Sequence, residues 1–136
     1  ALDVTRFMGK WFVLAQIPTP FDRGARGSVE EYAWNEAEQR VDVCFIMTRR
    51  NSASRTTLLQ RAYLRNPPTN SRWSLSPRLG GLYLPLALPY LVVDVDADYS
   101  TTIIGVPDRS IMYVMARAPA VSEDMLRGLL DKVCRL

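Results

Sequence analysis

Apolar and polar residues alternate in short runs along most of the chain, and this period-two pattern restricts the fold more than any other feature. In residues 41–47, for example, Val41, Val43 and Phe45 fall on one face of an extended strand. Turn-forming Asn, Asp, Gly and Pro residues separate the runs. The pattern predicts eight strands, over residues 10–16, 28–34, 41–47, 55–64, 72–76, 91–96, 101–106 and 111–117.

Only residues 122–133 have helical periodicity. Ser122 is a suitable N-cap residue, and two acidic residues follow it in the first turn, where the helix dipole favours them. Leu129 and Val133 then share one stripe. Eight successive strands with short connections and one terminal helix predict a single all-β domain over residues 1–136, an eight-stranded up-and-down antiparallel barrel with a C-terminal α-helix. Closure into a barrel removes the exposed edges of a flat sheet.

Composition excludes several classes of function. The 136 residues include no histidine, so Ser-His-Asp and Cys-His catalysis and histidine-ligated metals are excluded, and two cysteines cannot form a cysteine-only zinc site. The net charge of +3 is too small to indicate nucleic-acid binding. The longest apolar stretch, residues 82–93, contains two prolines and is too short to span a bilayer. We expect no cofactor and no metal.

Catalysis is also not expected. Asp94 and Asp96 share a strand face, but alternation places that face outward. Cys44 has no histidine or nearby lysine to activate it.

The inward side chains of a barrel this size either fill it or line a cavity for one small ligand. Alternation leaves both readings open. Aromatic residues with polar edges suit a mainly apolar binding site. The predicted ligand-lining side chains are Tyr32, Phe45, Leu58, Trp73, Leu91, Val93 and Tyr113.

Three segments in order resemble the motifs of the lipocalin family. Residues 3–12 contain Gly9-Lys10-Trp11, which resembles the Gly-x-Trp motif of the first strand. Residues 91–96 resemble the second motif, and the hairpin that begins with Gly-Val-Pro-Asp-Arg at 105–109 leads to Arg117, which resembles the arginine of the third motif. The resemblance is nearest to the group containing apolipoprotein D, bacterial outer-membrane lipocalin and temperature-induced lipocalins.

The resemblance assigns structural roles to Gly9, Trp11 and Arg117 at the closed end of the barrel. The Arg117 guanidinium is expected to lie on the indole of Trp11 and to donate hydrogen bonds to nearby carbonyl groups. Gly9 would allow a close approach of the backbone that a Cβ atom would block.

The resemblance also implies that the connections at 17–27, 48–54, 77–89 and 106–110 surround the open end. Arg49 and Arg50 would then lie at the rim and could bind an anionic head group. The implied function is binding and transport, or sequestration, of a small hydrophobic or amphipathic ligand such as a fatty acid or lysophospholipid, with its tail inward.

An alternative function is a membrane- or protein-interaction module that acts through the apolar loop at residues 79–90. This loop would either cover the cavity as a lid or make a peripheral contact with a membrane or partner protein. The oligomeric state is left open.

In the lipocalin fold the terminal helix packs outside the barrel, so an outward Cys44 could meet Cys134, which follows the helix. The resemblance therefore implies a disulfide between Cys44 and Cys134. Such a bond would indicate an oxidising compartment, so that the protein would be secreted, periplasmic or possibly membrane-associated.

Overall fold

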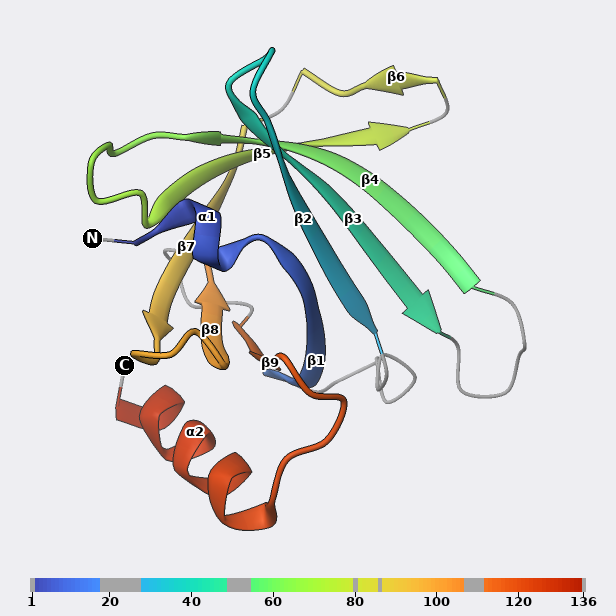
Figure 1. Cartoon of the computed structure of the whole chain (residues 1–136). Coiled ribbons are helices and arrows are strands. Elements are labelled where there is room, and N and C mark those ends of the chain that lie inside the picture. Colours follow the sequence, from blue (N-terminus) through green and yellow to red (C-terminus); the bar gives the residue numbers. More distant parts are fainter. Residues whose placement is uncertain are drawn as a thin grey trace.

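The computed structural model describes residues 2–17, 28–48, 55–79, 81–85, 87–106 and 112–135. In these residues, eight antiparallel strands form a closed barrel in which β1 pairs with both β2 and β9, and β4 pairs with β5 (Figure 1). The strands are β1 (Gly9–Ile17), β2 (Val29–Asn35), β3 (Arg40–Thr48), β4 (Arg55–Leu64), β5 (Arg72–Leu79), β7 (Leu88–Val95), β8 (Thr101–Gly105) and β9 (Met112–Ala116). The predicted up-and-down barrel is confirmed.

Two elements were not predicted from the sequence. The short strand β6 (Leu82–Tyr83) pairs only with β5 and extends beyond the barrel as a hairpin, at the top of Figure 1. The short helix α1 (Val4–Phe7) precedes β1, and Asp3 caps it by accepting hydrogen bonds from the backbone N–H groups of Thr5 and Arg6 at 3.1 and 3.3 Å. One turn is too short to give a helical period in the sequence.

The predicted C-terminal helix is α2 (Glu123–Arg135), and it packs outside the barrel (Figure 1). Ser122 caps it, because its Oγ accepts a hydrogen bond from the N–H of Met125 at 3.1 Å. Leu129 and Val133 are buried in a cluster with outward side chains of β8 and β9. The Nζ of Lys132 lies 3.3 Å from Oδ2 of Asp94 on β7, which places the end of α2 near that strand. No helix among the described residues is long and apolar enough to cross a bilayer.

The position of α2 overturns the predicted disulfide. Cys44 and Cys134 are both free thiols. Cys44 lies on β3, and in the sheet order β2, β1 and β9 separate β3 from β8. Strands are about 4.8 Å apart, whereas the two Cα atoms of a disulfide lie within about 7 Å. The cysteines therefore give no argument for an oxidising compartment.

The prediction of which β7 side chains point into the barrel was wrong by one residue. Trp73 of β5 is paired with Tyr90, so Tyr90 and Val92 point inward and are buried, whereas Leu91 and Val93 point outward. Val93 is 36% exposed. The residues from 90 to 93 are apolar on both faces, so alternation could not select one. A bulge between Val92 and Asp94 then changes the register with β8.

Candidate functional site

The closed end of the barrel is held by Arg117. Its guanidinium lies 3.8 Å from the ring centre of Trp11, which is fully buried. It also donates hydrogen bonds to five backbone carbonyl oxygens, those of Arg6 (2.7 Å), Lys10 (2.8 Å), Met8 (2.9 Å), Phe7 (3.1 Å) and Tyr99 (3.3 Å). Gly9 has a positive φ of 103°, and a Cβ atom there would lie 3.4 Å from Nη1 of Arg117. The side chain therefore joins α1, β1 and the β7–β8 turn.

Four aromatic side chains fill the interior above this clamp, and we call them the floor: Phe7, Trp11, Tyr32 and Trp73. The ring centre of Phe7 lies 5.1 Å from Trp11, 5.2 Å from Tyr32 and 5.6 Å from Trp73. All four are buried. Tyr32 and Trp73, two of the predicted ligand-lining residues, are thus part of the packed floor.

The next layer of inward side chains is only half-buried, and we call this layer the cup. Its described walls include Phe45, Leu58, Gln60 and Tyr113. Phe45 is paired with Leu58 across β3 and β4, and its ring centre lies 6.4 Å from that of Tyr113. Inward side chains that keep contact with solvent indicate that this end of the interior is accessible. Three predicted ligand-lining residues therefore lie together.

A carboxyl group that sequence reasoning missed lies between the floor and the cup. Glu30 on β2 is paired with Trp11 and Phe45, points inward, and is 5% exposed. Its Oε2 accepts hydrogen bonds from the hydroxyls of Tyr32 at 2.7 Å and Tyr90 at 3.3 Å, and these hydroxyls also bond to each other. Burial raises the pKa of Glu30 to about 7, although the two tyrosine hydrogen bonds act in the opposite direction.

The alternation of β2 contained the signal for Glu30. Because Tyr32 was predicted to point inward, Glu30 must share its face. The strand carries two adjacent glutamates, and Glu31 points outward, with its Oε1 3.7 Å from Nζ of Lys10. Two predicted rim residues, Arg49 and Arg50, lie outside the described residues.

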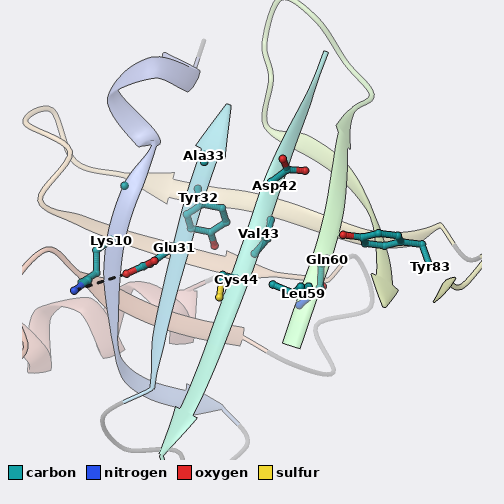
Figure 2. Close-up of a pocket in the computed structure, with 11 residues that line it drawn as sticks. Lys10, Glu31, Tyr32, Ala33, Asp42, Val43, Cys44, Leu59, Gln60 and Tyr83 are labelled. Atoms are coloured by element: carbon teal, nitrogen blue, oxygen red, sulfur yellow. Dashed lines mark ion pairs between the residues drawn. The ribbon is translucent and has the colours of Figure 1, made fainter. Parts of the chain in front are cut away.

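A pocket with a volume of about 390 Å³ is lined by residues of β1 to β4 together with Tyr83, and we call it the outer groove. Figure 2 shows Lys10, Glu31, Cys44 and Leu59 in a row across adjacent strands, with Tyr83 at the far side. Burial, together with the charge of Glu31, raises the pKa of the Cys44 thiol. The thiol therefore stays protonated near neutral pH and is a poor nucleophile.

The two outward aspartates have structural partners. Asp94 pairs with Lys132 of α2. Asp96 accepts hydrogen bonds from the N–H groups of Ser100 and Thr101 at 2.7 and 3.0 Å. Burial alone would raise the pKa of Asp96, but a hydrogen bond from the hydroxyl of Ser100, together with these backbone hydrogen bonds, outweighs it and lowers the pKa to about 2. Such a carboxylate holds a turn and is too weak a base for proton transfer near neutral pH.

Comparison with known proteins agrees with this architecture. Residues 2–136 match the model of the lipocalin-like domain family. Temperature-induced lipocalin-1 of Arabidopsis thaliana is 24% identical over 96% of this chain and 71% of its own length. The outer membrane lipoprotein Blc of Escherichia coli K12 is 23% identical over 98% of this chain and 72% of its own length.

Solved structures show the same fold. The major allergen Per a 4 from cockroaches superposes with a TM-score of 0.70 at 13% identity, covering 99% of this chain and 80% of that one. With the barrel, the outer helix and the Trp11–Arg117 pair in place, the family match over nearly the whole length shows that this chain belongs to the lipocalin-like domain family.

Proposed function

We propose that the protein binds one small hydrophobic or amphipathic molecule in the cup, for transport or sequestration. The observation that carries this proposal is the contrast between two layers of inward side chains. The floor is buried and packed, whereas Phe45, Leu58 and Tyr113 above it are half-buried. An apolar cup with few polar groups is typical of small-molecule sites. The family match supports binding as the general role.

Chain lipids, the class that includes fatty acids and lysophospholipids, have apolar tails that suit the cup. Each buried methylene contributes about 0.8 kcal/mol, so a chain with about ten buried carbons can offset the cost of association and reach micromolar affinity. Arg49 and Arg50, in the connection between β3 and β4, could bind an anionic head at the rim. Similarity to outer membrane lipoprotein Blc supports a location in the periplasm or at a membrane surface.

A matched pair of substitutions tests where the ligand binds. Leu58→Glu puts a charge on the cup wall, whereas Leu59→Glu puts the same charge on the outer face of β4, where Leu59 is already 37% exposed. We expect Leu58→Glu to weaken displacement of an apolar dye by dodecanoic acid at least tenfold, because a buried unpaired charge is costly. Leu59→Glu should bind normally. Binding lost only in Leu59→Glu would assign the ligand to the outer groove.

The dependence of affinity on the length of the lipid tail gives an independent test of the proposed function. In the wild-type protein, affinity should rise by up to roughly fourfold per methylene until the cup is filled. If no chain lipid displaces the dye at any length, the carrier proposal is wrong.

The exposed hairpin of β5 and β6 supports a second function, peripheral contact with a membrane. Leu82 is 76% exposed at the outer end of this hairpin. The guanidinium groups of Arg61 and Arg78 lie 3.5 and 5.9 Å from the ring centre of Tyr83. An exposed leucine beside an aromatic ring and two cations suits an anionic lipid surface. The hairpin stands apart from α2 in Figure 1.

We expect Leu82→Ser to weaken binding to vesicles that contain phosphatidylglycerol by several-fold, because it removes the exposed apolar contact. Met125→Ser is the control, since Met125 is 49% exposed on α2, away from this hairpin. Co-sedimentation with vesicles measures both variants. Equal loss in both variants, or in neither, would contradict a role for the hairpin.

A further inference from the structure

We propose that the end of the ligand lying deepest in the cup carries a hydroxyl or amino group, which donates a hydrogen bond to the carboxyl of Glu30. This inference rests on the proposed binding function and adds the chemical class of the ligand. The plain alkyl end of a fatty acid would leave this carboxyl facing hydrocarbon. A ligand with a donor at its inner end would form a hydrogen bond to the Glu30 carboxyl.

The position of Glu30 carries the argument. It is paired with Trp11 of the floor on one side and with Phe45 of the cup wall on the other. The carboxyl therefore lies at the boundary between the packed and accessible layers. Any molecule that fills the cup to its full depth ends beside it.

The hydrogen bonds of Glu30 leave acceptor capacity unused. An ionised carboxyl can accept about four hydrogen bonds. Both tyrosine hydroxyls contact Oε2, and Oε1 receives no hydrogen bond from the described part of the chain. Oε1 can therefore accept a hydrogen bond from a donor on a bound ligand.

Ser28 adds a second polar group on the same face. It lies opposite Val13, whose N–H donates to the carbonyl of Ser28 at 2.9 Å, and Val13 points inward. The Oγ of Ser28 is buried and has no hydrogen-bond partner within the described chain. Residues two apart on one strand are about 7 Å apart, so Ser28 and Glu30 form a polar stripe on an otherwise apolar wall.

Polar groups that break the pattern of a core and cost stability are most often found at functional sites. Burial disfavours the charged form of Glu30 more than the two tyrosine hydrogen bonds stabilise it, and this raises its pKa to about 7. Tyr32 on β2 and Tyr90 on β7 are the titratable groups that contact the carboxyl, and the pKa of each is raised well above its usual value. Both stay neutral, so the charge that a ligand would meet at pH 8 is that of Glu30.

The test compares dodecylamine, dodecanol and methyl dodecanoate as competitors for an apolar dye at pH 8. These probes share an apolar chain but differ in the end group, and only the first two can donate a hydrogen bond. We expect the amine and the alcohol to bind about tenfold more tightly than the ester. The preference for the amine should decrease at pH 6, where the carboxyl is largely protonated.

Glu30→Gln should remove most of the advantage of the amine over the ester. A circular dichroism spectrum that matches the wild type shows that this variant is folded. Glu31→Gln, on the outer face of the same strand, is the matched control and should behave like the wild type. If the three probes bind equally, or if both variants alter the preference alike, the inference is wrong although the carrier proposal stands. If no probe binds, the carrier proposal itself fails.

Discussion

Replacing Arg117 with alanine is expected to lower the free energy of unfolding by about 3 kcal/mol or more. The substitution removes the donors of five carbonyl oxygens that belong to α1, β1 and the turn before β8. It also removes the cation that lies 3.8 Å from the ring of Trp11, a contact that contributes about 0.5–2 kcal/mol. Urea unfolding followed by circular dichroism measures the change.

Arg6→Ala is the matched control for this experiment. The guanidinium of Arg6 also lies over an aromatic ring, 4.4 Å from the centre of Tyr99, but the side chain is exposed and donates one long hydrogen bond, 3.4 Å, to Ala97. An exposed contact of this kind contributes about 0.5–1 kcal/mol. Arg117→Lys should recover little stability, because an ammonium group cannot reproduce the fork of guanidinium donors. Equal stability of the two alanine variants would contradict the role of Arg117 as a clamp.

The features predicted most accurately from the sequence are those with strong local signals. Strands such as β3 alternate cleanly, because Val41 and Val43 face the core while Asp42 faces solvent. The helix α2 has both a capping serine and an apolar stripe. The closed end was expected from the resemblance of Trp11 and Arg117 to lipocalin motif residues, and the barrel brings them together from β1 and from the residue that follows β9.

The features that were missed depend on tertiary context. The run Leu91–Val93 is apolar on both faces, so only pairing with Trp73 and Ile104 selects Tyr90 and Val92 as the inward residues. The path of α2 over β8 and β9 separates the two cysteines, and no local pattern encodes that path. Glu30 was overlooked because a carboxyl is rarely buried, and its partner Tyr90 lies 60 residues away in sequence.

Glu30 predicts an unusual dependence of stability on pH. Burial raises the pKa of Glu30 from its ordinary value of 4.5 to about 7, so the folded state binds the proton more tightly than the unfolded state does. The stabilisation from this proton is therefore complete below pH 4.5 and is lost as the pH rises to 7. The free energy of unfolding should decrease by about 2–3 kcal/mol between pH 5 and pH 8.

The direction in which stability changes with pH distinguishes Glu30 from Asp96, the other carboxyl group whose pKa is shifted. The pKa of Asp96 is lowered to about 2, so Asp96 contributes stability above its ordinary pKa of 3.8 and loses it only as the pH falls towards 2. The window from pH 5 to pH 8 therefore separates the effect of Glu30 from that of Asp96. Histidine, which usually titrates there, is absent from the chain.

Glu30→Gln should abolish the decrease, because glutamine has nearly the same shape as the protonated acid and stays neutral throughout. At pH 8 this variant should be more stable than the wild type by about 2–3 kcal/mol, whereas at pH 5 the two should be nearly equal. Glu31→Gln removes a carboxyl from the outer face of the same strand and should keep the wild-type slope. A slope that persists in Glu30→Gln would mean that another group causes it and that burial does not raise the pKa of Glu30.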